Sequence, residues 1–383
     1  MTAGGTKPRV LLVSHFYPTH GGGVELVAAQ IAGRLAGEYG FRWAAARDAD
    51  RYPPPPGVAV IPLRAWNGIE RRTGVPVPLP GPLDVVRLAR EVRRSDLVWV
   101  HDLLYPANLV AAVAALVMRR RLVVTVHVGA VPYRNPLLRG LVGLAHRATR
   151  RVILPSAARV AFVSERVQRE TVGRHSWRRP PVLIRNGFDP TVFRLPADAE
   201  RAEVRRELDA ATRPLLLFAG RFVERKGLHL IRDLAARTPG WRWVLAGRGP
   251  IDPGRWGEAN VTVVRGASGA SLARLFGAAD LLVLPSVGEG FPLVVIEAMA
   301  CGTRAIVDPS TAAGDVTAAR WLETEPARGP DAVRAWHDHL ELLLARPAGV
   351  ANRRALADVA AGHWSWDRTA EAHRLVLRDA LRR

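Results

Sequence analysis

Hydrophobic and polar positions follow two regular patterns that take turns along most of the chain. Short apolar runs such as 9–15 and 97–100 are typical of strands that are buried on both faces of a sheet. Segments such as 24–35 carry apolar residues three or four positions apart, which is the spacing of an amphipathic helix. Because the two patterns alternate, they predict parallel sheets with helices on both faces.

The alternation occurs twice, which predicts two α/β domains. In the first half, strands are expected at 9–15, 41–46, 58–63, 97–100, 122–126, 160–163 and 182–184. In the second half, strands are expected at 214–220, 242–247, 261–264, 281–286 and 305–308, with helices at 227–237, 270–278, 292–301, 331–345 and 352–361. Residues 186–200, which contain two prolines and three acids, indicate a linker. We therefore expect two doubly wound, Rossmann-like domains that face each other across a cleft, and a last helix at 364–383.

The composition narrows the class of protein. Of the 383 residues, 48% are hydrophobic and 23% are charged, which is typical of a soluble globular protein. The one cysteine, Cys301, excludes an internal disulfide and a cysteine-rich zinc module, and it fits a reducing cytosol. No secretion signal is recognised at the start, and the apolar segment 103–118 is too short to span a membrane. We expect a cytoplasmic protein in which 103–118 forms a buried helix.

Positive charge is concentrated in the first half. The net charge is +20, and residues 1–195 hold 29 basic against 12 acidic residues, while 196–383 hold 26 against 23. A basic half favours an anionic partner, such as a nucleic acid, a membrane surface or a phosphorylated substrate. Nucleic acid is not expected, since the chain has no helix-turn-helix, zinc-finger or RNP pattern. The alternative explanation is biased coding, because 53 of the 55 basic residues are arginine.

Segment 136–154 combines a stripe of leucine and alanine with arginines that lie largely elsewhere on the helix. This pattern predicts a basic amphipathic helix, which could lie peripherally on the inner, anionic face of a membrane. The alternative is a packing helix whose arginines are solvated.

Two cations follow the strand at 214–220. Arg221 and Lys226 lie between this strand and the next predicted helix, where they could converge on a diphosphate near the helix N-terminus. The alternative is a pair of solvated surface charges. Apart from Lys7 near the terminus, Lys226 is the only lysine of the chain, which favours a need for a compact charge at this position.

Two carboxylates follow the strand at 281–286. Glu289 lies in a glycine-containing loop, and Glu297 lies in the helix that begins near Pro292. Free amides at Leu293 and Val294 could hold a phosphate. Two carboxylates beside a phosphate site suit a nucleotide sugar, with one carboxylate for the hexose and one for the ribose. The alternative is a carboxylate that stabilises the helix N-terminus and a second one on the surface.

Weaker signals lie at strand ends in the first half. The loop Gly21-Gly22-Gly23 could let an anionic ligand approach the backbone, or it could be a plain turn. His127 ends the run VVTVH, where a histidine is either functional or structural. His101 and Asp102 also follow a strand, and His15 and His20 lie near the first glycine loop, but their spacing matches no metal motif, and we expect no metal site.

Together these motifs resemble the family 4 glycosyltransferases of GT-B fold. The matching segments include HFYPTHGGGVELVAAQIAGRLA, FVSERV, IRNGFDPTVF, FAGRFVERKGL, LPSVGEGFPLVVIEAMACGT and HWSWDR. The resemblance implies a retaining transfer of a sugar from a nucleotide sugar of UDP or GDP type to an acceptor hydroxyl, with no other cofactor. It also implies an acceptor-binding domain at 1–195 and a donor-binding domain at 196–363, and leaves open a return of the last helix to the first domain.

The resemblance also assigns roles to residues. It implies that Arg221 and Lys226 bind the donor diphosphate, that Glu289 contacts the donor sugar and that Glu297 contacts the ribose. Catalytic roles are implied for His127 and Glu289. The other donor-binding positions that it implies are Gly22, Gly23, Gly290, Phe291, Pro292, Leu293 and Val294.

Three departures and several alternatives accompany this resemblance. Pro292 stands where the family often has glycine, Arg304 stands where proline is usual, and the usual Gly-Gly-x-Pro-Glu-like loop is not visible in DPSTAAGDVTAARW. The acceptor is expected to be a lipid-linked, polysaccharide or glycolipid intermediate, and a soluble small molecule is the alternative. A sugar-nucleotide epimerase and a sugar-binding homologue without activity are the remaining alternatives.

Overall fold

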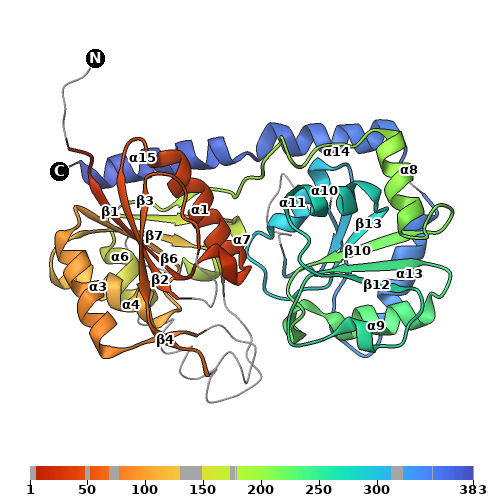
Figure 1. Ribbon diagram of the computed structural model, residues 1–383, viewed down its shortest axis with the longest axis horizontal. Helices are drawn as coiled ribbons and strands as arrows, with labels where there is room; N and C mark the ends of the chain where they lie inside the picture. Colours follow the sequence, from red (N-terminus) through yellow and green to blue (C-terminus); the bar gives the residue numbers. More distant parts are fainter. Residues whose placement is uncertain are drawn as a thin grey trace. The chain divides into compact units, whose positions relative to one another are not determined.

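The computed structural model describes residues 6–47, 52–68, 77–129, 149–172, 177, 179–311, 322–346 and 348–382 (Figure 1). The chain divides into two compact units, which are residues 1–186 with 366–383, and residues 187–365. The domain limits expected after residues 195 and 363 stay predictions. In the structure the last helix, α15 (Trp366–Leu381), packs on α1 (Gly23–Leu35) and β7 (Arg121–Val126) of the first unit.

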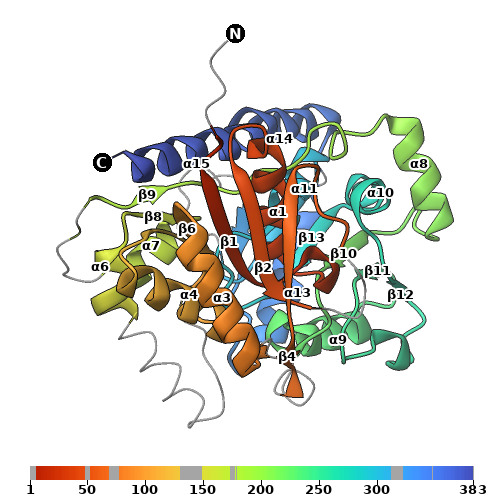
Figure 2. The same cartoon turned by 60° about the vertical axis from the view of Figure 1, so that its left-hand side comes forward.

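The first unit is built on a seven-stranded parallel sheet in the order β3-β2-β1-β6-β7-β8-β9. Figure 2 shows α1 and α15 on one face and α3 and α4 on the other. Its other elements include β1 (Arg9–Phe16), β2 (Gly40–Ala46), β3 (Val58–Leu63), α3 (Pro82–Arg94), β6 (Leu97–His101), α4 (Pro106–Val117), α6 (Leu154–Ser156), β8 (Arg159–Phe162), α7 (Glu165–Thr171) and β9 (Val182–Leu183).

The strand order of the first unit reverses between β1 and β6. Strands β1 and β6 are parallel neighbours, as are β6 and β7, so their carboxyl ends meet at one edge of the sheet. In doubly wound sheets ligands bind at this edge, beside the reversal of strand order. The edge carries His15 from β1, Asp102 directly after β6 and His127 directly after β7.

The second unit repeats the plan with a six-stranded parallel sheet in the order β12-β11-β10-β13-β14-β15. The reversal lies between β10 and β13, whose loops carry the two motifs of the second half. The elements are α8 (Asp198–Glu207), β10 (Leu215–Ala219), α9 (Leu228–Arg237), β11 (Arg242–Ala246), β12 (Val261–Val264), α10 (Gly269–Ala278), β13 (Leu281–Leu284), α11 (Leu293–Ala300), β14 (Arg304–Val307), β15 (Leu322–Thr324), α13 (Ala332–Leu344) and α14 (Val350–His363).

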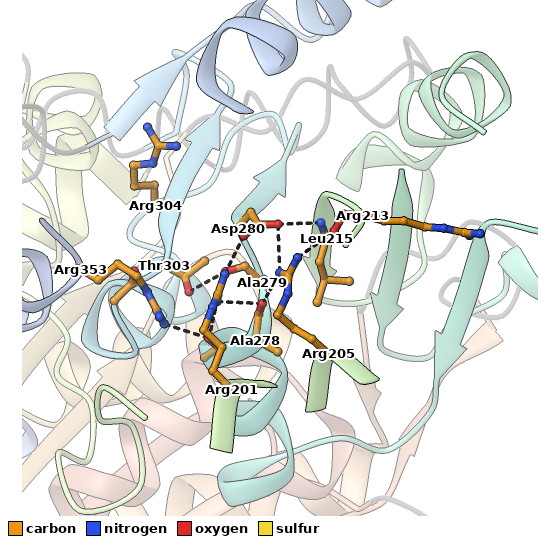
Figure 3. A network of polar contacts seen from close by, with 12 residues as sticks. Arg201, Arg205, Arg213, Leu215, Ala278, Ala279, Asp280, Thr303, Arg304 and Arg353 are labelled. Atoms are coloured by element: carbon orange, nitrogen blue, oxygen red, sulfur yellow. Dashed lines mark hydrogen bonds and ion pairs between the residues drawn. The ribbon is translucent and has the colours of Figure 1, made fainter. Parts of the chain in front are cut away.

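Partly buried charges connect helices of the second unit to the amino edge of its sheet (Figure 3). Asp280 accepts hydrogen bonds from Arg201 (2.6 Å), Arg205 (3.0 Å) and the amide of Leu215 (2.8 Å), which joins α8 to the starts of β10 and β13. Arg201 also donates to the carbonyl of Gly277 (2.8 Å) at the end of α10. The positive guanidinium complements the negative end of that helix.

Arg353 of α14 completes this arrangement (Figure 3). Its guanidinium is buried and donates to the carbonyls of Gly277 (2.9 Å), Cys301 (3.3 Å) and Gly302 (3.2 Å). One side chain thereby caps the C-terminal ends of both α10 and α11. Burial lowers the pKa of Arg353 to about 10, which leaves the group charged at neutral pH.

Arg304, which replaces the usual proline, has a structural explanation. It opens β14 and donates to the carbonyl of Leu343 (2.8 Å) near the end of α13. A proline at this position would lack that donor.

The fold class expected from the sequence is confirmed, and the strand limits agree to within about two residues. The linker prediction for 186–200 is wrong at its end, because α8 begins at Asp198. The helix expected at 103–118 begins at Pro106, and it is buried on one face only, since Val113 and Val117 are exposed. Strand β15 and the short β4–β5 pair (Ala65–Trp66 and Leu79–Pro80) were not predicted. Most of segment 136–154 lies outside the described residues.

Candidate functional site

The loops after β10 and β13 bring a lysine and a glutamate together in the second unit. Lys226 is 8% exposed, and its Nζ lies 2.9 Å from Glu289 Oε1. Gly227 has a left-handed backbone (φ +73°), and a Cβ there would lie 2.6 Å from the carbonyl oxygen of Pro285. Only glycine allows this close approach, which holds the two loops together next to the ion pair.

A second cation contacts the same carboxylate. Arg225 Nη1 lies 2.8 Å from Glu289 Oε1, so two positive groups share one oxygen. Burial alone would raise the pKa of Glu289, but the charges of Lys226 and Arg225 outweigh it and lower the pKa to about 2. Burial lowers the pKa of Lys226, and the negative charge of Glu289 partly offsets this.

Glu297 has the opposite environment. It lies on α11 and is buried, and no hydrogen bond or ion pair from the described part of the chain reaches its carboxylate. Burial raises its pKa to about 8. The two carboxylates of one motif therefore differ in charge at neutral pH, which is the separation expected of groups with different tasks.

The other expected donor-site residues of the second unit lie in the same two loops and at the start of α11. Arg221 is half-buried, and its charge helps to lower the pKa of Lys226. Gly290 and Phe291 are buried, and the Phe291 ring packs against Trp364 with ring centroids 6.0 Å apart. Pro292 is the N-cap residue of α11. The helix then begins at Leu293, followed by Val294, which places their amides in its first turn.

In the first unit, His127 pairs with a second histidine. His127 Nε2 lies 2.9 Å from His101 Nδ1, and the two rings stack with centroids 5.0 Å apart. Burial lowers the pKa of His127 to about 3 and that of His101 well below its ordinary value. Both imidazoles are therefore neutral at physiological pH, and one donates the hydrogen bond to the other.

Asp102 fixes the backbone at His127. Its Oδ1 accepts hydrogen bonds from the amides of His127 (2.8 Å) and Val128 (3.4 Å). Asp102 has a left-handed backbone (φ +66°), which Asn108 supports by donating to its carbonyl at 3.0 Å. Burial raises the pKa of Asp102 to about 7.

The glycine loop of the first unit lies against a buried ion pair. Gly22 is the N-cap residue of α1, and Gly23 is its first residue. His15 Nε2 lies 3.0 Å from Glu25 Oε1. Burial alone would raise the pKa of Glu25, but the pairing with His15 outweighs the effect of burial, so the pKa of Glu25 is lowered. A Cβ on Gly22 would lie 2.1 Å from Glu25 Oε2, so the glycine leaves room for this carboxylate. The His15 ring also stacks on Tyr105 at 3.8 Å.

Some contacts of these sites had not been foreseen from the sequence. Lys226 and Glu289 were expected in one site, but Arg225 had no assigned role, although it adjoins Lys226. The pairing of His101 with His127 was also missed. This pairing could have been predicted from the sequence, because the two histidines lie at the carboxyl ends of consecutive expected strands, which are parallel neighbours in the structure.

One group of side chains in the described residues could share a metal ion. It consists of His337, Asp338 and Glu341 on α13, and the two acids are exposed. These residues lie outside the motifs of the sequence, and nothing links them to the candidate site.

Comparisons with protein families match both halves of the chain. Residues 21–192 match the family described as Glycosyltransferase Family 4, and residues 213–345 match the family described as Glycosyl transferases group 1. The two matches together cover most of the chain, and they agree with the resemblance carried by the motifs.

Curated relatives include D-inositol 3-phosphate glycosyltransferases. The chain is 35% identical over 218 residues to that of Mycolicibacterium paratuberculosis, which covers 52% of this chain and 47% of the relative. It is 33% identical over 217 residues to that of Mycobacterium tuberculosis strain H37Ra, which covers 52% and 44%. The alignments thus span about half the length of these relatives.

Solved structures extend the likeness to the whole fold. The protein HepE of Anabaena, solved in complex with UDP, has a TM-score of 0.72 at 18% identity and covers 97% of this chain and 99% of its own. Sucrose-phosphate synthase of Thermosynechococcus elongatus has a TM-score of 0.70 at 20% identity and covers 97% and 98%. At this identity the likeness concerns the fold of two Rossmann-like domains.

Proposed function

Because the chain belongs to the family 4 glycosyltransferases, we propose that it transfers a sugar from a nucleotide-sugar donor to an acceptor hydroxyl, with retention of anomeric configuration. The observation that carries the proposal is the contact of Glu289 with Lys226 and Arg225. It places a charged carboxylate, suited to sugar hydroxyls, beside cations suited to a diphosphate.

The cations have a defined task in this reaction. When the bond to the sugar breaks, negative charge grows on the leaving diphosphate. Arg221, Lys226 and the amides at the start of α11 stabilise that charge, and they are in place before the reaction begins. HepE, a structural neighbour, has been solved with UDP and with UDP-glucose, which supports a UDP-type donor, with a GDP-type donor as the alternative.

Glu289 acts as a sugar-binding group in this mechanism. A carboxylate with a pKa of about 2, held by two cations, is a weak base and a weak nucleophile. Covalent attack by Glu289 on the sugar is therefore disfavoured. We propose instead that the acceptor attacks from the side of the leaving group, whose phosphate oxygen takes the acceptor proton.

His127 contributes as a neutral imidazole. Its depressed pKa keeps the positive charge off the ring, and Asp102 holds its backbone amide. A neutral imidazole can exchange a hydrogen bond with a hydroxyl of the transferred sugar without competing with the cations for the diphosphate. Glu297 accepts a hydrogen bond from a ribose hydroxyl in the same proposal.

The acceptor is proposed to be presented at an anionic membrane, as a lipid-linked intermediate. On α3 every exposed charged side chain is an arginine, because the acids Asp84 and Glu91 are buried, and α4 carries no charged residue. The same helices expose Leu83 (85%), Val86, Val113 and Val117 (76%) to solvent. Apolar side chains with arginines beside them suit an anionic bilayer surface.

The attachment would be peripheral. Within the described part of the chain, no helix is both long and apolar enough to cross a membrane. The curated relatives are named for a phosphorylated polyol, D-inositol 3-phosphate, which supports a soluble anionic acceptor as the alternative.

The proposal is tested with the purified protein and a panel of UDP- and GDP-sugars that carry a labelled hexose. Calorimetry measures donor binding, and NMR of the product reports the anomeric configuration. An epimerase would release a free epimer from the nucleotide sugar with no acceptor present. If no nucleotide sugar of the panel binds, the proposal is refuted.

A further inference from the structure

The backbone of the loop that carries Glu289 is fastened at three consecutive residues. The carbonyl of Ser286 accepts a hydrogen bond from Thr311 Oγ1 at 2.7 Å. The amide of Val287 donates to the carbonyl of Arg225 at 3.2 Å, and the amide of Gly288 donates to Ser310 Oγ at 3.1 Å. The side chain of Glu289 then contacts Lys226 and Arg225.

Two of these fastenings come from one turn, Asp308-Pro309-Ser310-Thr311, which directly follows β14. Asp308 Oδ1 accepts hydrogen bonds from the amide of Ser310 at 2.8 Å and from its hydroxyl. Asp308 Oδ2 accepts from the amide of Ala327 at 2.9 Å. Because the Ser310 hydroxyl gives its proton to Asp308, its lone pairs are directed by that bond and one accepts from Gly288.

This turn begins the segment DPSTAAGDVTAARW, in which the Gly-Gly-x-Pro-Glu-like loop expected from the resemblance is not visible. We propose that Ser310 and Thr311, oriented by Asp308, are positioning residues that set Glu289 for contact with the donor sugar. Residues 308–311 are called the clamp below. The inference rests on the proposed function, because it assigns the clamp to the sugar-binding role of Glu289.

The geometry supports a role in positioning as well as in folding. Gly288 has a left-handed backbone (φ +79°), so the loop turns sharply one residue before Glu289. The clamp holds the backbone on the entry side of this turn, while Lys226 and Arg225 hold the end of the side chain. Without the Ser310 hydroxyl, the carboxylate would keep its cations, but the backbone would lose the anchor nearest to Glu289, at Gly288. A small displacement of a group that contacts the substrate can lower the catalytic rate strongly even when the substrate still binds.

The chain offers a matched control for the clamp. Asp189-Pro190-Thr191 forms a turn of the same sequence type, in which Asp189 Oδ1 accepts from the Thr191 amide at 2.9 Å and from its hydroxyl at 2.6 Å. No amide in the part of the chain that the structure describes donates to the Thr191 hydroxyl. Thr191→Ala therefore removes the same hydroxyl-to-carboxylate hydrogen bond without touching the Glu289 loop.

The test compares wild type, Ser310→Ala, Ser310→Thr and Thr191→Ala. Amide hydrogen exchange, which needs no substrate, should become at least about tenfold faster at Gly288 in Ser310→Ala and stay unchanged in the other two variants. In sugar transfer from UDP-glucose, or from whichever donor of the panel is used, kcat should fall about tenfold or more in Ser310→Ala. The Kd for the bare nucleoside diphosphate should stay within about twofold, and Ser310→Thr should restore kcat.

Two results would overturn the clamp. One is wild-type exchange and wild-type kcat in Ser310→Ala, and the other is an equal loss of nucleotide affinity and kcat, which would mean general disruption of the unit. Failure of the proposed function has a different signature. In that case the wild-type protein itself binds no nucleotide sugar. Slow exchange at Gly288 that depends on Ser310 would still show that the clamp anchors the loop. With no donor sugar to contact, however, the positioning role would be overturned.

Discussion

The ammonium group of Lys226 lies 2.9 Å from the carboxylate of Glu289, although the two residues follow different strands, β10 and β13. The lysine is thus engaged by a carboxylate of its own unit. A diphosphate that binds here would share the ammonium with Glu289, so the diphosphate contact and the sugar contact of the proposed site are coupled through one side chain.

The first prediction concerns the diphosphate. Lys226→Ala and Arg221→Ala should each weaken nucleoside diphosphate binding by about 1.5–3 kcal/mol, the range for a charge-assisted hydrogen bond. Calorimetry with UDP and GDP measures the effect. Arg232→Ala is the control, because Arg232 is an exposed cation on α9, in the same unit. Unchanged affinity in both site variants would remove the diphosphate assignment.

The second prediction separates the two carboxylates. Glu289→Gln keeps the shape of the side chain but loses the charge that the cations hold, so kcat should collapse while the bare nucleoside diphosphate still binds. Glu297→Ala should instead raise the Kd of the nucleotide, because the proposed ribose contact is lost. Steady-state kinetics and calorimetry together decide the matter, and identical profiles for the two variants would show that the division of roles is wrong.

The third prediction concerns the pH dependence of stability. The pKa of Glu297 is about 8 in the folded protein, against roughly 4.3 for an unperturbed glutamate. Between these values the folded state keeps a proton that the unfolded state has lost, so this group makes the free energy of unfolding fall as pH rises. Glu297→Gln should therefore be more stable than wild type at pH 8–9, by a few kcal/mol, and the difference should vanish near pH 4.

Denaturant titrations at several pH values measure this difference. Glu203→Gln serves as the control, because Glu203 is exposed on α8. A constant difference between Glu297→Gln and wild type at all pH values would contradict the assignment of a buried, protonated carboxyl group.

The fourth prediction concerns Arg353. Arg353→Ala should lower the free energy of unfolding by about 2–3 kcal/mol, because the buried carbonyls of Cys301 and Gly302 lose a charged donor. Arg353→Lys should recover only part of it, since a single ammonium does not reproduce the planar fork of the guanidinium. Arg354→Ala is the matched control, because Arg354 is the exposed neighbour on α14. Equal stability of the two alanine variants in urea would disprove the capping role.

The fifth prediction concerns the membrane. The protein should co-sediment with anionic vesicles at low salt and be released at high salt. Each basic residue near an anionic surface contributes about 1 kcal/mol of attraction, and salt screens this attraction. Replacing Arg87 and Arg90 of α3 by glutamine should reduce the bound fraction. The same replacement of Arg232 and Arg237 on α9 should not. Absence of vesicle binding at low salt would favour the soluble acceptor.

The fold could be predicted from the sequence because the patterns that indicate its strands and helices are local and occur repeatedly. Buried strands of a parallel sheet appear as continuous apolar runs, and their crossover helices as amphipathic segments, so most elements were placed to within two residues. Helix α8 was missed because it is short and polar on nearly all sides, and only Val204 is buried. Its position depends on Arg201 and Arg205 reaching Asp280, a contact of residues far apart in the sequence.

The candidate site was accessible only in part. Strand ends and motif spacing made Glu289, Lys226 and His127 candidates, but no local pattern shows which partner each side chain contacts. The two turns Asp189-Pro190-Thr191 and Asp308-Pro309-Ser310 have the same local code and the same internal hydrogen bonds. The turns differ in their hydroxyl contacts, because within the described residues the Gly288 amide donates to Ser310 and no amide donates to Thr191. The contact of Ser310 depends on the packing of β13 against β14.

The buried guanidinium of Arg353 limits where the chain can be cut in domain exchange. The family match in the second half ends at residue 345, before α14 begins at Val350. A hybrid protein that took its donor-binding half from this chain and ended it at residue 345 would leave α10 and α11 without their shared cap. Such a hybrid would keep every motif of the proposed donor site, but the C-terminal ends of α10 and α11 would lack the hydrogen bonds that Arg353 donates. Exchangeable halves of this chain therefore need to keep α14 with the second sheet.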